Sequence, residues 1–363
     1  MDPRTRNLAR TLSRYCLSAT TKDVISIGAT PAAESLVVAL YEELIKAGAF
    51  PVVNMLPEAC HQGLLSKGKP VHFEQPNPYT LAGVKTLTGS TRICSSTNTR
   101  ALSAVNPKRQ AALAKANAPL GKFAHTLKWN VTLFPTEAYA QDADMSLSAF
   151  EDYVYGATFS DEAKPVNAWR DLTRKQARLI RSLEGAETVR IIGPDTDLTL
   201  SIKGRIFMNS DGRRNMPSGE VFTGPVETSA EGFIRYDYPV CHGGREIEGI
   251  RLLFRKGLVV EATATKNQAY LKAMLDMDPG ARRLGELGIG TNFKIQRFIK
   301  NILFDEKIGG TVHLALGSSY AETGGKNTSA LHWDMIKDLR KGGELIVDGK
   351  VIQRDGKFLN RIF

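Results

Sequence analysis

The chain has 363 residues, of which 42% are hydrophobic and 24% charged, a composition typical of a folded globular protein of about two domains. Its 48 basic residues outnumber the 38 acidic ones for a net charge of +10, but no block of like charges marks a nucleic-acid-binding patch. No apolar run approaches the roughly 20 residues of a membrane-spanning helix. The four cysteines form no CxxC pair, which excludes a zinc ribbon and a disulfide scaffold. We therefore expect a cytoplasmic protein that binds neither nucleic acid nor membranes.

The first part of the chain alternates helix and strand signals. Asp2 can cap a helix whose first turn contains Pro3, and an amphipathic pattern follows. Residues 23–29 indicate a buried strand, residues 33–47 have leucines at helical spacing, and residues 50–55 form a second apolar run. A strand, a helix and a strand in this order predict a βαβ unit and hence a parallel sheet.

Later segments change in character. Strands are expected at residues 91–95 and 129–133, and helices at residues 107–116 and 163–183. The second half is richer in β-branched and aromatic residues separated by short turns. It predicts strands at 188–192, 197–202, 233–239, 250–255 and 258–264, helices at 268–275 and 293–304, and a hairpin over 344–358 around Asp348-Gly349.

These signals predict an α/β protein of two domains. Residues 1–185 would form an N-terminal parallel-sheet α/β domain, and residues 186–363 a mixed α+β catalytic domain. The sequence contains neither a GxGxxG dinucleotide fingerprint nor a P-loop, so the first domain carries no nucleotide-binding signal. It also lacks the GxSxG elbow of a serine hydrolase.

Side chains that bind metals gather in four segments of the second half, where they lie among glycines and apolar residues. The segments are 215–222, 285–292, 311–317 and 320–334. Glycines allow the backbone to approach a site closely, and apolar neighbours imply burial. A buried carboxylate or imidazole needs a partner, because its transfer from water is costly.

The triplet from His332 to Asp334 carries the clearest signal. On a strand the first and third residues share a face, so this imidazole and this carboxylate would point together. His313 lies in an apolar strand pattern. Two imidazoles and carboxylates on neighbouring strands are suitable ligands for divalent metals. Taken singly, a buried histidine is more often a hydrogen-bonded core residue, and a carboxylate such as Glu286 in a glycine-rich turn is more often solvated.

Together the four segments resemble the thermophilic metallo-aminopeptidase family of the aminopeptidase T and aminopeptidase S type. The matching patterns are N-x-P-x-G-E-x-F at 215–222, E-L-G-x-G-x-N at 286–292, H-x-A-x-G at 313–317, a tyrosine at Tyr320 and H-x-D at 332–334. Residues 129–147 also resemble a segment of the family's first domain, so the resemblance covers most of the chain.

The resemblance implies a two-metal exopeptidase that takes peptides with a free N-terminus and forms a homodimer. The residues that match the family's metal ligands are Glu220, Glu286, His313, His332 and Asp334. Zn, Co, Mn and Mg all suit such ligands. Two ions would activate a shared water, one of them holding the α-amine and the other polarising the scissile carbonyl. Glu286 would orient or deprotonate the water, and Tyr320, which matches the catalytic tyrosine, would donate a hydrogen bond to the oxyanion.

Two other interpretations remain open at the level of sequence. His313, His332 and Asp334 also satisfy the facial triad of a mononuclear non-heme Fe(II) enzyme, and the ring-opening dihydroxypyridine dioxygenases are similar to this aminopeptidase family. Such an iron site does not need Glu220 and Glu286, which favours the peptidase. The other interpretation is a basic binding protein with a vestigial site, which the retention of all six site residues disfavours.

Overall fold

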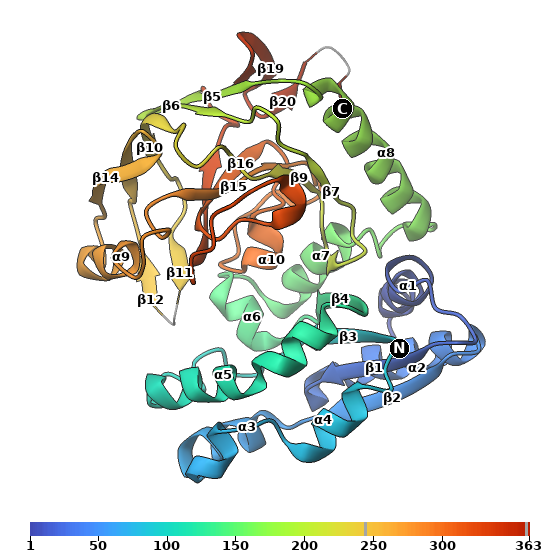
Figure 1. Cartoon of the computed structure of the whole chain (residues 1–363). Helices are drawn as coiled ribbons and strands as arrows, with labels where there is room; N and C mark the ends of the chain where they lie inside the picture. Colours follow the sequence, from blue (N-terminus) through green and yellow to red (C-terminus); the bar gives the residue numbers. More distant parts are fainter. Residues whose placement is uncertain (243–244, 360–361) are drawn as a thin grey trace. The chain divides into compact units, whose positions relative to one another are not determined.

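The computed structural model describes residues 1–242, 245–359 and 362–363 (Figure 1). The chain forms two compact units, Met1–Ala168 with Gly212–Pro217, and Trp169–Asp211 with Ser218–Phe363. Helix α8 (Pro165–Leu183) runs from the first into the second, where Leu179 and Leu183 join the hydrophobic core. The division at residues 1–185 and 186–363 stays a prediction.

The first unit is built on a parallel sheet with the strand order β2-β1-β3-β4-β8 (blue to teal in Figure 1 for the first four). Its strands are β1 (Val24–Ala29), β2 (Phe50–Met55), β3 (Gly89–Cys94), β4 (Lys128–Leu133) and β8 (Asn215–Met216). Its helices are α1 (Pro3–Thr11), α2 (Glu34–Lys46), α3 (Glu58–Lys67), α4 (Pro78–Val84), α5 (Pro107–Ala124), α6 (Glu137–Asp142) and α7 (Leu147–Ala157), with 3-10 turns at Pro31–Ala33 and Pro70–Phe73 and a π-helical turn at Leu12–Cys16.

Local chemistry explains how this unit begins. The Asp2 side chain accepts a hydrogen bond from the backbone N–H of Arg4 at 2.7 Å, which satisfies one of the donors at the start of α1. In α2 the leucines at helical spacing, Leu36, Leu40 and Leu44, are fully buried. Strand β1 pairs in parallel with β2, so the βαβ unit predicted at the start of the chain is confirmed.

The second unit contains two large antiparallel sheets, with the orders β14-β13-β10-β6-β5-β18-β19-β20 and β17-β16-β15-β9-β7, and the β11-β12 hairpin. Its strands are β5 (Thr188–Gly193), β6 (Thr196–Ser201), β7 (Met208–Ser210), β9 (Glu220–Thr223), β10 (Glu231–Arg235), β11 (Val240–His242), β12 (Arg245–Ile247), β13 (Arg251–Arg255), β14 (Leu258–Thr263), β15 (Leu284–Gly290), β16 (Thr311–Gly317), β17 (His332–Asp338), β18 (Glu344–Val347), β19 (Lys350–Arg354) and β20 (Lys357–Phe358). Its short helices are α9 (Gln268–Leu275), α10 (Ile302–Asp305) and a 3-10 turn at Ala321–Thr323.

One hydrophobic core joins these two large sheets. Ile191 and Leu252 from the eight-stranded sheet belong to the same buried cluster as Leu287, Leu314 and Met335 from the five-stranded sheet. Burying each such side chain contributes about 1.5–3 kcal/mol. Because side chains alternate along a strand, the residues between these core positions must project from the opposite face of the five-stranded sheet.

The hairpin predicted around Asp348-Gly349 is confirmed by β18 and β19. Asp348 has φ 45° and Gly349 has φ 77°, the left-handed values that a two-residue primed turn requires. Among the described residues, no helix combines the length and apolar character needed to cross a bilayer.

The helix expected over residues 293–304 is wrong, because only the short helix α10 forms there. The preceding loop uses other hydrogen bonds. Asp305 accepts the backbone N–H groups of Ile299 and Asn301, at 2.8 and 2.6 Å, and Lys300 has the left-handed φ of 61°. A buried carboxylate therefore provides the bonds that a longer helix would otherwise supply.

Candidate metal centre

The predicted site residues lie on one face of the five-stranded sheet, whose strands β7, β9, β15 and β16 are labelled in Figure 1. Four adjacent strands supply them, namely β9 with Glu220, β15 with Glu286, β16 with His313, and β17 with His332 and Asp334. Their sequence neighbours Val221, Leu287, Val312, Leu314 and Trp333 belong to the core cluster behind the sheet. The period of two along each strand therefore directs all five ligand-type side chains to the same side.

Small residues leave room for these side chains. Gly288 lies directly opposite His313 across the β15–β16 pair, and a Cβ atom at this glycine would lie 2.0 Å from the imidazole Cε1. Only glycine therefore allows the ring to lie over the neighbouring strand. Ala315 pairs with Glu286 on one side and with Asp334 on the other, so a methyl group separates two carboxylates.

The imidazoles and carboxylates form a continuous chain of contacts. Nε2 of His313 lies 3.3 Å from Oε2 of Glu220 and 3.4 Å from Oε1 of Glu286. Nε2 of His332 lies 3.4 Å from Oε2 of Glu286 and 3.5 Å from Oδ2 of Asp334. Glu286 thus directs one oxygen toward each imidazole.

Two overlapping groups of ligand atoms result. Single ligand atoms of Glu220, Glu286 and His313 lie within 4.8 Å of one another, as do those of Glu286, His332 and Asp334. The structure therefore brings together all five residues that the sequence predicted as ligands. Glu286 is common to both groups.

Two further residues of the centre, Glu306 and Lys307, were not predicted from the sequence. Glu306, directly after α10, forms a third group within the same distance with His313 and Asp334. The fully buried ammonium of Lys307 donates to Oε1 of Glu220 at 2.8 Å and also contacts the Glu306 carboxylate. The available sequence signal was the acidic pair at residues 305–306 followed by a lysine, just before the strand that carries His313.

The Lys307 ammonium should stabilise the fold most when no metal is present. In chelator, Lys307→Met removes one of the two cations beside the buried Glu220 carboxylate and leaves the protonated imidazole of His313 as the other, so we expect the free energy of unfolding to fall by up to about 3 kcal/mol. Urea unfolding measures this change. Lys337→Met is the matched control, because Lys337 is equally buried but its partner Asp237 is 35% exposed and can be solvated. Equal losses in the two variants would contradict the role given to Lys307.

Contacts outside the ligand groups orient His332 and Tyr320. Nδ1 of His332 lies 2.9 Å from the carbonyl of Ser318, to which it donates when protonated, so Nε2 faces the carboxylates. The ring of Tyr320 packs against Phe222 and His332, with centroids 5.3 and 5.5 Å apart. The Tyr320 side chain is 48% exposed, and its ring lies at the edge of the centre.

Burial and mutual charge shift the pKa values of His313, His332, Asp334 and Glu286. Burial alone lowers the pKa of His313, but Glu286 and Glu220 raise it to about 9. Burial also lowers the pKa of His332, but Glu286 and Asp334 outweigh this effect and raise it to about 10. Burial raises the pKa of Asp334 to about 7. At Glu286 the two imidazoles outweigh burial and lower the pKa to about 2.

The side chains present fit a divalent metal ion. Buried Oε2 of Glu220, Nδ1 of His313 and Oδ1 of Asp334 have no hydrogen-bond partner within the described part of the chain. Buried polar atoms without partners are rare in folded proteins, and each needs an explanation such as an ion or water. The donors are imidazole nitrogens and carboxylate oxygens, which suit Zn, Co and Mn.

A buried cluster of imidazoles and carboxylates on one sheet face could hold a divalent metal ion. Comparison with known proteins identifies the family. The thermophilic metalloprotease family (M29) matches residues 1–358, and the chain belongs to it. The predicted family is thereby confirmed, and membership in a metalloprotease family implies a divalent metal cofactor.

The relatives found by sequence are consistent with this family. Aminopeptidase 2 of Geobacillus stearothermophilus is 30% identical over 295 residues, which cover 70% of each chain. Aminopeptidase T of Thermus thermophilus is 29% identical over 262 residues, which cover 64% of each chain.

Two solved structures share the fold. Wild-type AmpT from Thermus thermophilus superposes with a TM-score of 0.86 at 23% identity, covering 98% of this chain and 99% of that one. The predicted fold class, an N-terminal parallel-sheet α/β region followed by a mixed α+β region, is confirmed, and the second region is rich in antiparallel strands. A 2,5-dihydroxypyridine dioxygenase from Pseudomonas putida KT2440 has a TM-score of 0.59 at 14% identity, with 99% and 98% coverage. At these identities the likeness shows the fold alone.

Proposed function

We propose that this enzyme removes the N-terminal residue of peptides by attack of water at a two-metal centre. The proposed ligands are Glu220, Glu286, His313, His332 and Asp334, with Glu306 as a sixth candidate. The observation that carries the proposal is the pair of overlapping ligand groups that share Glu286. A carboxylate with one oxygen directed to each group is the arrangement expected of a ligand common to two neighbouring ions.

The class of activity follows from the family. The chain belongs to a metalloprotease family, and its relatives are named aminopeptidases, so it is a metal-dependent aminopeptidase. The number of ions, their identity and the role of each residue are the parts that we propose.

The charge of the centre favours two ions over one. Four carboxylates, those of Glu220, Glu286, Glu306 and Asp334, meet one buried ammonium, that of Lys307. With neutral imidazoles the cluster then carries three net negative charges. A single divalent ion cannot neutralise them, and buried net charge is costly.

When bound, the ions supply Lewis acidity that takes up the free α-amine, polarises the scissile carbonyl and lowers the pKa of a water toward neutrality. The protein groups supply the rest. We propose that the Glu286 carboxylate, ionised as a metal ligand must be, also orients the attacking water or accepts its proton. Burial, together with the nearby carboxylates Glu286 and Asp334, raises the pKa of Tyr320, so its hydroxyl stays protonated and can donate to the oxyanion.

Metal removal and restoration test the function. We expect chelator to abolish hydrolysis of aminoacyl arylamides, and back-titration with Zn²⁺, Co²⁺ or Mn²⁺ to restore it with saturation near two ions per chain. N-acetylated substrates should resist cleavage by the restored enzyme, because acetylation converts the α-amine into an amide whose nitrogen lone pair is delocalised and does not bind a metal. Elemental analysis and the arylamide assay measure both effects.

Two outcomes would contradict the proposal. Full arylamidase activity in metal-free protein would exclude the metal mechanism, and equal cleavage of acetylated and free substrates would exclude anchoring by the amine. A 2,5-dihydroxypyridine assay with Fe²⁺ under air runs beside these tests. Ring opening with one ion per chain and no arylamidase activity would favour the dioxygenase.

Proton release tests the ligand set independently of turnover. In the metal-free protein the pKa values of about 9 and 10 keep His313 and His332 protonated at pH 7, whereas a metal ligand must be neutral. Zn²⁺ binding at pH 7 should therefore release about two protons from the imidazoles and about half a proton from Asp334, whose pKa is about 7, and affinity should rise with pH. Calorimetry in buffers of different ionisation enthalpy measures the release. Binding without proton release would remove both imidazoles from the ligand set.

We also propose a cytoplasmic homodimer, as the family resemblance and the low cysteine content favour. Light scattering tests the dimer. A mass corresponding to one chain at working concentration would contradict it.

A further inference from the structure

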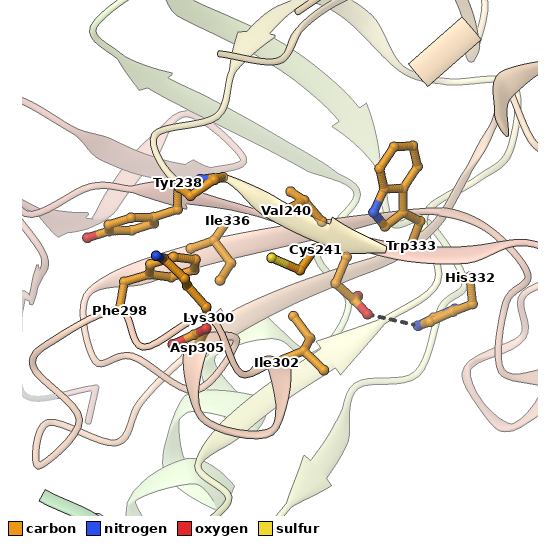
Figure 2. A pocket seen from close by; sticks show the side chains of 12 residues that line it. Tyr238, Val240, Cys241, Phe298, Lys300, Ile302, Asp305, His332, Trp333 and Ile336 are labelled. Atoms are coloured by element: carbon orange, nitrogen blue, oxygen red, sulfur yellow. Dashed lines mark ion pairs between the residues drawn. The ribbon is translucent and has the colours of Figure 1, made fainter. Parts of the chain in front are cut away.

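A small cavity adjoins the proposed ligands His332 and Asp334 (Figure 2). Its volume is about 130 Å³, and it lies entirely within the second unit. Most of its wall is apolar, formed by Tyr238, Val240, Cys241, Phe298, Ile302 and Ile336. The cavity is thus an apolar recess directly beside the polar and charged side chains of the proposed metal ligands.

The aromatic wall of the cavity is held in place. The rings of Tyr238 and Phe298 stack with centroids 4.7 Å apart and an interplanar angle of 9° (Figure 2). The Tyr238 hydroxyl donates to Oδ2 of Asp338 and accepts from the guanidinium of Arg340, each at 2.7 Å. A wall fixed by stacking and by two hydrogen bonds presents a defined shape to whatever enters.

The loop that carries Phe298 and Ile302 is fixed as well. Asp305, which is 1% exposed, uses its two carboxylate oxygens to accept backbone N–H groups at Ile299 and Asn301. Those oxygens already have donors, so Asp305 positions the loop and is a poor partner for a cationic ligand group. The ammonium-bearing Lys300 also lines the cavity and would repel such a group.

We propose that this cavity receives the side chain of the substrate's N-terminal residue and selects an uncharged apolar side chain the size of leucine, methionine or phenylalanine. The inference rests on the proposed function. In an aminopeptidase substrate, the first Cα lies between the α-amine and the scissile carbonyl. If both of those groups meet the metal centre, the side chain on that Cα must enter space that adjoins the ligands.

The size and the lining of the cavity set the expected preference. An apolar cavity of about 150 Å³ accommodates benzene, so a recess of about 130 Å³ suits a branched aliphatic chain or a phenyl ring. Indole should be too large, and alanine should leave part of the cavity unfilled. A cationic side chain would meet the Lys300 ammonium, an anionic one would face the carboxylates of Asp305 and Asp334 against that single ammonium, and either would lose hydration in an otherwise apolar recess.

The test is a panel of aminoacyl arylamides with Leu, Met, Phe, Ala, Trp, Arg and Glu. With metal-loaded enzyme we expect kcat/KM for Leu to exceed that for Ala, Arg and Glu by about 10-fold or more, the effect of filling or misfilling an apolar pocket. Absence of arylamide cleavage altogether would refute the proposed function. Cleavage of Arg or Glu substrates as efficiently as Leu would refute only the cavity assignment.

Ile302 provides the variants, because it lines the cavity yet is 48% exposed, so its replacement should leave the core intact. Ile302→Phe narrows the cavity and should lower the Leu/Ala ratio of kcat/KM by about 10-fold. Ile302→Ala widens it and should raise the Trp/Leu ratio. The control is Val260→Phe on β14, also 50% exposed but outside the cavity, which should leave both ratios unchanged. Unchanged ratios in both Ile302 variants would overturn the inference.

Discussion

Replacing Glu286 with glutamine is expected to lower kcat by about 10³-fold or more. No other residue belongs to both the Glu220–His313 group and the His332–Asp334 group among the clusters found in the described chain. Glutamine keeps the size of the side chain and removes its charge and basicity. The change should therefore weaken metal binding at both groups and remove the base that takes the proton of the attacking water. Steady-state kinetics and metal analysis of the same preparation measure the two losses.

Glu227→Gln is the matched control for this variant. Glu227 is a partly buried carboxylate of the same unit, paired with Arg205 at 2.7 Å, but it lies in none of the ligand groups. It should keep its metal content and its kcat. If Glu286→Gln retained two ions and near-normal kcat, Glu286 would be neither a shared ligand nor the base.

The direction of the ligand side chains on β16 and β17 was predictable because core residues and ligand-type residues alternate there. On β16, His313 lies between Val312 and Leu314, and those two apolar side chains pin the strand to the core, so the imidazole must face away. The same logic predicts that His332 and Asp334 share a face, as the structure confirms. Spacing within one strand thus fixes which side chains point together.

What spacing could not predict is which strands become neighbours. The register that sets Glu286 opposite Ala315, and Ala315 opposite Asp334, depends on pairing between segments far apart in sequence. Here the family resemblance predicted that the ligand residues of the separate segments meet at one site, which the residue pattern alone could not predict. Glu306 shows the limit of pattern reading, because it lies on no strand and its position is set by the loop that Asp305 anchors.

The failed helix over residues 293–304 has a related cause. Helical spacing of apolar residues is a local signal, whereas the loop actually formed satisfies its backbone through a buried carboxylate and packs Phe298 onto Tyr238. Tertiary contacts outweighed local preference. The loop also contributes both Ile302 and Phe298 to the cavity beside the metal centre, so local pattern fails where the chain builds a candidate binding surface.

Replacing Tyr320 with phenylalanine should separate transition-state stabilisation from metal binding. The ring packs against Phe222 and His332, and phenylalanine preserves that packing. The hydroxyl is not among the ligands that we propose, so metal content should not change. If the hydroxyl donates to the oxyanion, its interaction exists only in the transition state. We then expect kcat to fall by about 10²-fold with little change in KM.

Two comparisons make the Tyr320 result decisive. Tyr270→Phe removes a hydroxyl from a ring that packs under Arg245, outside the metal centre, and should leave kcat unchanged. Tyr320→Leu removes the ring and the hydroxyl together. Any loss of kcat beyond that of Tyr320→Phe therefore measures the contribution of the ring, which packs against His332. Should Tyr320→Phe turn over at the wild-type rate with normal metal content, the hydroxyl would have no part in the reaction. The bound ions alone would then stabilise the oxyanion, since Tyr320 is the one protein donor that we assign to the oxyanion.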